Sequence, residues 1–301
     1  MTSNEVPNAR ESTSQSTGQP AGGLATGWVY VRVALDVPLA GPFDYVATNS
    51  ILVGSRVVVP FGRRRLIGVV LATDIEPSIE RSTIRAIERV LDDLSPLPPT
   101  WMALSQFAAH YYQRPVGEVM LPALPVPLRR LSHYEGKRSG EGPVVKWQAR
   151  RAKAKSPLGV SLETPDKPVP VELNDEQTAA VQALSASQGF NAYLLHGITG
   201  SGKTQVYLAA AAQVLLRGGR VLFLVPEINL TPQFAAALAH RLGEVVPPSG
   251  VAVLHSGLSD GERLDAWLRT FDGTARIVLG TRLAVFAPMV DVDLIVVDEE
   301  H

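Results

Sequence analysis

The chain has 301 residues, enough for two or three compact domains, and its 46% hydrophobic and 19% charged content is typical of a folded protein. It contains no cysteine, which excludes disulfides and thiolate-bound zinc or iron–sulfur sites within these residues. The polar N-terminus has no apolar segment that would form a secretory signal, and no apolar run approaches the roughly 18 residues of a membrane span. We therefore expect a cytoplasmic protein that makes no membrane contact.

The net charge of −1 hides an uneven distribution along the chain. Residues 129–170 carry 10 basic and 4 acidic side chains, whereas residues 171–301 carry 8 and 14. A basic stretch of this kind attracts polyanions locally. A solvated linker has the same composition, and the charge pattern alone favours the linker.

The N-terminal third begins with residues 1–26, which are rich in Ser, Thr, Asn, Gln and Gly and are predicted to be a disordered tail. Short runs rich in β-branched residues follow at 29–35, 56–60 and 66–71, separated by Gly, Pro and Asn turns. These runs predict a small β-domain over 27–98.

A helical segment is expected over 99–128, with Thr100 as its candidate N-cap. The apolar side chains that follow at helical spacing and predict one buried face are Trp101, Leu104, Phe107, Ala108 and Tyr111. Residues 129–170 contain prolines and show weak periodicity, so they predict a basic linker or a small, poorly marked domain.

From Asn174 onward, strand and helix patterns alternate. The predicted strands lie at 192–196, 221–225, 251–254, 277–279 and 294–297. Predicted helices begin at the capping pattern of Asn174 and Gln177, at 203, at Thr231-Pro232, and at the capping box of Ser259 and Glu262. This alternation predicts a doubly wound parallel α/β sheet over 171–301.

A phosphate-binding loop lies between the first predicted strand and its helix. Gly197-Ile198-Thr199-Gly200-Ser201-Gly202-Lys203-Thr204 fits the pattern G-x-x-x-x-G-K-[ST]. Glycines let backbone N–H groups curl around a triphosphate, and the helix N-terminus adds partial positive charge. Lys203 can neutralise the β- and γ-phosphates, and Thr204 can offer its hydroxyl to Mg²⁺. The motif predicts binding of a nucleoside triphosphate with Mg²⁺.

An acidic motif supplies the second half of this predicted site. The apolar strand at 294–297 delivers Asp298 to its carboxyl end, where ligands bind in sheets of this kind. Asp298 is expected to hold Mg²⁺ through water, and Glu299 to orient or deprotonate the attacking water.

The motifs around the phosphate loop narrow the class of protein. Asp298-Glu299-Glu300-His301 is a DExH box of the kind that superfamily 2 helicases carry. Gln177 lies 20 residues before Gly197, where such enzymes place a glutamine that reads adenine. Helix capping explains Gln177 equally well, and both roles are compatible.

Further stretches make the chain resemble the primosomal protein N′ family of bacterial replication-restart DNA helicases. They are LVPEINLTPQ at 224–233, HSGL at 255–258, IVLGTRLAVFAP at 277–288, VALDVPL at 33–39, FDY at 43–45, GSRVVVPFG at 54–62 and AHYY at 109–112. The resemblance covers roughly 28–128 and 173–301, and two independent halves agree in the family's order.

The resemblance implies that the β-domain binds the nascent 3′ end at a stalled fork. Asp44, in a Phe-Asp-Tyr turn, is then expected to accept a hydrogen bond from a terminal 3′-hydroxyl, and Phe43 or Tyr45 to offer a stacking surface. An ordinary turn Asp beside core aromatics is the alternative. The candidate phosphate contacts, which are equally consistent with a solvated hairpin tip, are Arg63, Arg64 and Arg65.

The resemblance also implies roles in the C-terminal half. Arg282 is placed to touch the backbone of single-stranded DNA, although a surface salt bridge is the alternative. The resemblance also implies that Glu227 and Gln233 couple the nucleotide and DNA sites, although a role at the end of a helix is the alternative. The family has a winged helix where 100–170 stand, and the basic run in 129–170 adds salt-dependent DNA affinity.

As a whole, the resemblance implies an ATP- and Mg²⁺-dependent 3′-to-5′ helicase, cytoplasmic and nucleoid-associated, whose partners are forked and single-stranded DNA, primosome proteins and single-strand-binding protein. The family's second RecA-like lobe, with its arginine finger and cysteine zinc site, has no counterpart before His301. We therefore expect a chain that stops after the first lobe and hydrolyses ATP slowly. The alternatives are a non-catalytic primosome-assembly scaffold and, less favoured, an unrelated phosphate-loop NTPase such as a kinase.

Overall fold

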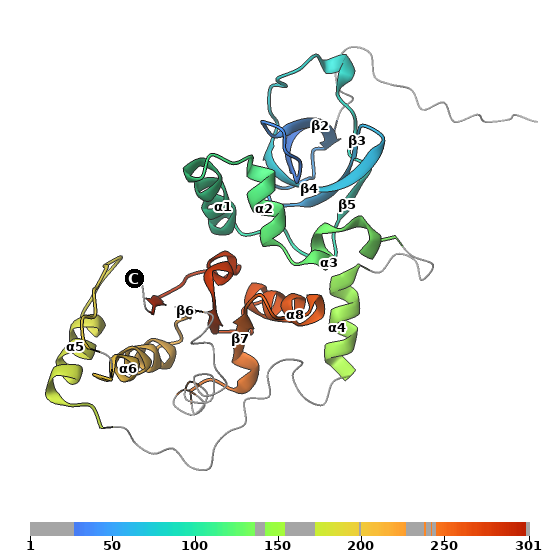
Figure 1. The fold of residues 1–301 in the computed structure, drawn as a ribbon. Helices are drawn as coiled ribbons and strands as arrows, with labels where there is room; N and C mark the ends of the chain where they lie inside the picture. Colours follow the sequence, from blue (N-terminus) through green and yellow to red (C-terminus); the bar gives the residue numbers. More distant parts are fainter. Residues whose placement is uncertain are drawn as a thin grey trace, which may run out of the picture.

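The computed structural model describes residues 27–135, 142–153, 172–198, 200–226, 238, 242 and 245–298. The predicted tail at 1–26 and the predicted helix at Thr231-Pro232 lie outside these residues. Among the described residues, no helix is long and apolar enough to cross a membrane. Figure 1 shows an N-terminal sheet with covering helices above a second, C-terminal sheet.

The N-terminal sheet is antiparallel, with strand order β2-β1-β4-β3-β5. Its strands are β1 (Trp28–Leu35), β2 (Phe43–Thr48), β3 (Arg56–Phe61), β4 (Arg64–Thr73) and β5 (Arg89–Leu91). β-Branched residues alternate along these strands, so one face of the sheet forms a core that includes Val31, Val33 and Val57. The opposite face, through Ala34 and Val69, packs against helices.

Three helices share the core on that opposite face: α1 (Pro99–Tyr111), α2 (Val116–Ala123) and α3 (Val126–Arg129). α2 approaches β1 so closely that a Cβ on Gly117 would lie 1.8 Å from the carbonyl oxygen of Leu35. Only glycine fits at this contact, which fixes the helix against the sheet. The short 3₁₀ turns η1 (Arg81–Thr83) and η2 (Leu131–His133) complete this half.

Two predictions about α1 are wrong. The N-cap is Pro98, and Thr100 lies inside the helix because the proline is pre-organised for helix entry. The residues that the helix buries are Trp101, Met102, Ser105, Ala108 and Ala109. Phe107 and Tyr111 are 64% and 67% exposed, because α2 and the sheet pack on a stripe displaced from the predicted one. The helical periodicity of apolar residues predicted the helix itself. It could not show which of two overlapping apolar stripes on that helix would be buried.

The basic segment contains a helix, α4 (Pro143–Lys153), between residues that lie outside the described part. α4 buries Val144 and Trp147 in the same core as α8 (Asp260–Phe271) of the C-terminal half. Figure 1 shows α4 beside α8. This part of the segment is therefore a docked element rather than a free linker.

The C-terminal sheet is parallel, with strand order β7-β8-β6-β9. Its strands are β6 (Val221–Leu224), β7 (Val251–Leu254), β8 (Ile277–Gly280) and β9 (Leu294–Val297). The accompanying elements are α5 (Asp175–Ser185), α6 (Lys203–Leu216), η4 (Pro248–Gly250), α8 and η5 (Arg282–Phe286). Val221 and Phe223 of β6 share a core with α6, whereas Leu222 shares a core with α8. Helices thus pack on both faces, as a doubly wound sheet requires.

The predicted strand at 192–196 is wrong in this structure. Residues 191–198 form no strand, and Leu194 is 90% exposed. The segment is apolar enough for a buried strand, but a strand also needs a hydrogen-bonded neighbour. Among the described residues, β9 is the edge of the sheet and pairs only with β6.

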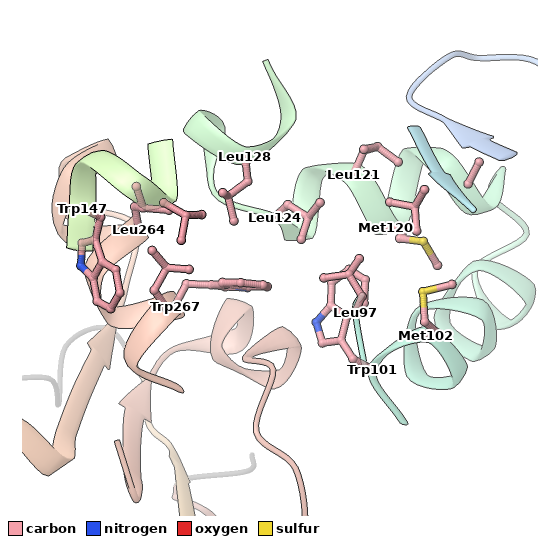
Figure 2. Close-up of a cluster of buried hydrophobic side chains, with 14 residues drawn as sticks. Leu97, Trp101, Met102, Met120, Leu121, Leu124, Leu128, Trp147, Leu264 and Trp267 are labelled. Carbon is pink, nitrogen blue, oxygen red and sulfur yellow. The ribbon is translucent and has the colours of Figure 1, made fainter. Parts of the chain in front are cut away.

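One core joins the two halves of the molecule. It runs from Trp101 and Met120 in the N-terminal helices to Leu264 and Trp267 of α8 (Figure 2). Side chains from five helices and the N-terminal sheet contribute to it, so α1, α2, α3, α4 and α8 are packed as one unit.

Candidate nucleotide and DNA-end sites

The phosphate loop leads directly into α6. Gly200 and Gly202 have φ angles of 81° and 83°, in the left-handed region that glycine adopts without strain, and Gly202 is the N-cap of the helix. A Cβ on Gly202 would lie 2.4 Å from Nε2 of Gln177. The loop is therefore a glycine cradle that opens onto a helix N-terminus, as an anion-binding loop requires.

Lys203 lies against the loop that precedes it. Its Nζ donates to the carbonyl oxygens of Gly197 at 2.7 Å and Ile198 at 3.2 Å. These bonds hold the ammonium group against the backbone of the loop, so a phosphate bound by the loop lies within reach of its charge.

The tertiary structure brings Thr204 and Asp298 together through Tyr207. The Tyr207 hydroxyl lies 3.0 Å from Oγ1 of Thr204 and 3.3 Å from Oδ2 of Asp298, which is 91 residues away from Tyr207 in the sequence. Asp298 follows directly after β9, and its backbone N–H donates to the carbonyl oxygen of Leu224 at 2.9 Å. This bond fixes the backbone of Asp298 against the end of β6. A hydroxyl and a carboxylate, each in contact with the same Tyr207 hydroxyl, are oxygen donors of the kind that Mg²⁺ prefers.

Gln177 performs the capping role that the sequence predicted. Its Oε1 accepts from the N–H of Asn174 at 3.0 Å, and Asn174 accepts in return from the N–H of Gln177 at 2.8 Å. Its Nε2 also donates to the carbonyl oxygen of Ser201 at 3.1 Å. Gln177 therefore ties the start of α5 to the phosphate loop, and a role toward a base stays a prediction.

The carboxyl ends of the four parallel strands meet at one edge of the sheet. β8 ends at Gly280, and the exposed Arg282 begins η5 directly after it. The N–H of Thr281 donates to the carbonyl oxygen of Leu254 at 3.1 Å, which fixes this turn against β7. Arg282 thus lies at the same sheet edge as Asp298, where parallel α/β sheets bind ligands.

The candidate DNA-end residue Asp44 is not in a turn, as the sequence predicted, but in β2, and it is only 7% exposed. Its Oδ1 accepts from Nε of Arg32 at 3.1 Å. Its Oδ2 accepts from the amide of Ser78 at 2.6 Å and from the Ser78 hydroxyl at 2.7 Å. The Phe-Asp-Tyr run can extend because it pairs with β1, where Arg32 is the direct partner of Asp44.

These contacts set the ionisation of Asp44. Burial alone would raise the pKa of the carboxyl, but the hydrogen bonds from Ser78 and from Arg32, with the charge of Arg32, lower the pKa below its ordinary value of 3.8. Asp44 is therefore a carboxylate at neutral pH and can only accept hydrogen bonds.

The two neighbouring aromatics have different surroundings. Tyr45 is 5% exposed, its hydroxyl donates to the carbonyl oxygen of Pro60 at 3.0 Å, and burial raises its pKa to about 12. Phe43 is partly exposed and packs edge-on against Phe61, with ring centroids 5.2 Å apart. Of the two predicted stacking surfaces, only Phe43 reaches the molecular surface in this structure.

The three candidate arginines also differ in their surroundings: Arg65 forms ion pairs, whereas Arg63 and Arg64 do not pair with described residues. Arg65 pairs with Glu135 at 2.8 Å and with Glu88 at 3.8 Å. Arg63 lies in the turn between β3 and β4 and Arg64 is the first residue of β4; both are exposed, and neither forms an ion pair with the described residues. They are the members free to meet a phosphate.

Sequence reasoning missed two contributors, Ser78 and Tyr207. Ser78 reaches Asp44 from a loop 34 residues away, and no local pattern marks it. Tyr207 lies one helical turn after Thr204, so its position near the loop could have been predicted from the sequence. Its contact with Asp298 could not, because that contact depends on where β9 lies in the sheet. The predicted residues Thr199, Glu227, Gln233 and Glu299 lie outside the described part of the chain.

Comparison with known proteins separates the chain into the same two halves. Residues 32–125 match the family model described as the 3′ DNA-binding domain of PriA. Residues 170–301 match the model described as the res subunit of type III restriction enzymes.

The chain is also similar to proteins named replication restart protein PriA. It is 34% identical to that of Haemophilus influenzae, over 90% of this chain and 44% of the relative. It is 33% identical to that of Treponema pallidum, over 90% of this chain and 38% of the relative. It is 48% identical to that of Synechocystis over 130 residues, 43% of this chain and 15% of the relative. The chain thus spans less than half the length of these relatives.

Proposed function

Because this chain belongs to the PriA family of replication restart proteins, we propose that it binds a 3′ DNA end through its β-domain and Mg-ATP through its parallel-sheet lobe. Its biological role is then recognition of stalled forks and initiation of primosome assembly. The contact of Tyr207 with both Thr204 and Asp298 carries the nucleotide part of this proposal, because it places a loop hydroxyl beside the acidic end of β9.

The residues around the loop fit a triphosphate with Mg²⁺. The left-handed Gly200 and Gly202 leave room for phosphate oxygens beside the first N–H groups of α6, and Lys203 supplies the positive charge. Thr204 and Asp298 hold the Mg²⁺ side of the nucleotide. When bound, Mg-ATP supplies the free energy of phosphoryl transfer for movement on DNA. Glu299 is assigned to orient the attacking water.

The DNA-end part of the proposal rests on Asp44. A 3′-terminal hydroxyl donates to the Asp44 carboxylate, which Arg32 and Ser78 keep ionised. Because the Asp44 side chain is only 1% exposed, the hydroxyl has to displace one of these donors to reach it. Phe43 stacks on the terminal base, and Arg63 and Arg64 bind nearby phosphates. In the other half, Arg282 contacts the backbone of a single strand.

The activity of the complete family member is part of the proposal: 3′-to-5′ unwinding coupled to ATP hydrolysis, with primosome proteins and single-strand-binding protein as partners. We assign the protein to the cytoplasm, associated with the nucleoid. The competing hypothesis is a scaffold that binds ATP without hydrolysing it, and steady-state hydrolysis in the presence of forked DNA separates the two.

The test of the nucleotide site is Lys203→Ala, with Arg217→Ala at the other end of α6 as control. We expect Lys203→Ala to abolish binding of a fluorescent ATP analogue with Mg²⁺ and to leave binding to forked DNA unchanged, whereas Arg217→Ala changes neither. Analogue binding that survives Lys203→Ala would contradict the assignment of the loop.

The test of the DNA-end site compares forks that end in a 3′-hydroxyl with forks that end in a 3′-phosphate. We expect about tenfold tighter binding to the hydroxyl end, the value of one charge-assisted hydrogen bond. Asp44→Asn should remove this preference, and Asp74→Asn, an exposed control on the same domain, should keep it. Equal affinities for both ends in the wild type would remove Asp44 from the site.

A further inference from the structure

The Asp44 carboxylate is closed off from solvent by the side chains that bind it. Its own side chain is only 1% exposed, whereas the side chain of Arg32, which donates to Oδ1, is 33% exposed. Ser78, which donates to Oδ2, is an exposed residue. A DNA end that reaches Asp44 must therefore replace a donor from Arg32 or from Ser78, and the fold holds these two residues in different ways.

Arg32 is the donor that the sheet fixes. It lies in β1 as the direct partner of Asp44 in β2, so the backbones of the two residues are adjacent in one ladder. Its guanidinium also supplies the positive charge that balances the carboxylate. Displacing Arg32 would leave a buried carboxylate without its counter-charge, which is costly.

Ser78 lies in a segment between β4 and η1 that is bound to the sheet only near its ends. On one side, the N–H of Ile75 donates to the carbonyl oxygen of Tyr30 at 3.2 Å. On the other side, the N–H of Val46 donates to the carbonyl oxygen of Arg85 at 2.9 Å. Between these two points, the backbone–backbone hydrogen bonds among the described residues stay within the segment. Ser78 is therefore the donor that can leave with less disturbance of the fold.

The hydroxyl of Ser78 has the chemistry of a DNA 3′ end. It is an alcohol that donates to Oδ2 of Asp44 at 2.7 Å, and a terminal 3′-hydroxyl is an alcohol that can donate to the same oxygen. Exchange of one for the other preserves both the hydrogen bonds on the carboxylate and its charge. The backbone N–H of Ser78, 2.6 Å from Oδ2, can stay in place, because rotation about the Cα–Cβ bond alone moves the hydroxyl away.

We propose that Ser78 is a specificity-determining residue of the DNA-end site, and that its hydroxyl occupies the position of the terminal 3′-hydroxyl until DNA displaces it. The inference rests on the proposed function, because it takes Asp44 to be the acceptor of the 3′-hydroxyl. Without DNA, the Ser78 hydroxyl keeps a buried carboxylate hydrogen-bonded, which an unfilled acceptor position would not do.

The proposal has two consequences for affinity. Ser78 competes with DNA inside the same molecule, so the measured affinity for a 3′ end is reduced by the fraction of molecules in which its hydroxyl still occupies the site. A 3′-phosphate cannot enter by this exchange, because it brings negative charge, rather than a hydroxyl donor, to the carboxylate.

A purely structural role for Ser78 predicts the opposite effect of its removal. If the hydroxyl served only to hold Asp44 in place for DNA, its loss would weaken binding of a 3′-hydroxyl end. If the hydroxyl competes with that end, its loss strengthens the binding. The sign of the change in affinity therefore separates the two roles.

The test uses the full chain and fluorescence anisotropy with forks that end in a 3′-hydroxyl or in a 3′-phosphate. We expect Ser78→Ala to bind the hydroxyl end more tightly than the wild type does, by up to about tenfold, the value of one hydrogen bond. Its affinity for the phosphate end should equal that of the wild type. Ser78→Thr restores a hydroxyl and should return the affinity for the hydroxyl end toward the wild-type value.

The control is Ser132→Ala, at an exposed serine of η2 in the same half, which should change neither affinity. Far-UV circular dichroism checks that every variant is folded. An affinity of Ser78→Ala for the hydroxyl end that equals or falls below the wild-type value overturns the competition. Equal gains on both ends also overturn it, because the gain would then not depend on a hydroxyl.

Failure of the proposed function gives a different result. In that case the wild type itself binds the two ends equally, and Asp44 is not the acceptor of a 3′-hydroxyl. A wild type that prefers the hydroxyl end, together with a Ser78→Ala variant that gains nothing, would leave the proposed function intact and remove only the role of Ser78.

Discussion

Trp101 of α1 donates its indole N–H to the main-chain carbonyl oxygen of Phe286 in η5 at 2.8 Å, across 185 residues of sequence. η5 begins with Arg282, the candidate DNA contact at the carboxyl edge of the parallel sheet. A helix of the N-terminal half therefore holds the end of the turn that presents Arg282.

Trp101→Phe tests this link, because phenylalanine retains most of the packing but has no N–H donor. We expect a loss of about 1–3 kcal/mol in the free energy of unfolding, the cost of leaving a partly buried carbonyl without a partner. Urea unfolding measures it. Trp28→Phe, at an exposed indole, should change stability little, and equal losses in both variants would show that the bond to Phe286 is not the cause.

The ion pair of Asp265 and Arg269 is expected to be sensitive to the loss of one partner. Both side chains are buried, so Asp265→Asn leaves a buried guanidinium uncompensated and should cost about 3–5 kcal/mol. The control is Asp272→Asn, since Asp272 pairs with Arg151 near the surface and exposed pairs contribute about 0–1 kcal/mol. Chemical unfolding of both variants gives the comparison. A smaller loss for Asp265→Asn than for Asp272→Asn would contradict the buried network.

Gly117 is expected to tolerate no side chain. A Cβ at this position would lie 1.8 Å from the Leu35 carbonyl, which belongs to backbone and cannot rotate away, so Gly117→Ala should cost about 1–3 kcal/mol or more. Gly261→Ala, in the first turn of α8 with open space around its Cβ, should be neutral or stabilising. Thermal unfolding of the pair tests whether the contact between α2 and β1 is as close as described.

Asp44 gives a prediction about pH. Its native pKa lies below the ordinary 3.8, so its contribution to stability is complete above the unfolded value and is lost as pH falls through the native value. Ser78→Ala removes one donor and raises the native pKa. We expect this variant to be less stable than the wild type at neutral pH, and the difference to shrink below about pH 4.

Unfolding free energies at neutral and at acid pH test this prediction, with Ser132→Ala, an exposed serine of η2, as the reference substitution. A difference between wild type and Ser78→Ala that stays constant with pH would mean that the Ser78 hydroxyl acts on packing rather than on the charge of Asp44.

Local patterns in the sequence predicted the helix caps, most strands of the parallel sheet and the phosphate loop. The capping boxes at Asn174 and Ser259 form as predicted, and the strands at 221–225, 251–254, 277–279 and 294–297 agree with β6 to β9 to within a residue. Each of these features depends on residues a few positions apart. The phosphate loop belongs to the same class, since its glycines and the following helix act over eight residues.

The failures share one cause, which is that the missing information was long-range. The apolar run at 192–196 has strand composition but no strand neighbour among the described residues. Phe107 has helical spacing but stays 64% exposed and stacks only on Tyr111 of its own helix among the described residues. The Phe-Asp-Tyr run was interpreted as a turn because its pairing with β1 is not a local property.

The sequence by itself determined the fold class of each half, the position of the nucleotide loop and the family, because each of these depends on particular residue types at short, fixed spacings. Only the tertiary structure decided that Tyr207 meets Asp298, that Ser78 reaches Asp44, and that the basic segment presents α4 on the surface of the lobe. The physical reason is that each of these contacts joins residues brought together by burial of a common core, and a core is selected by the whole chain rather than by any one segment.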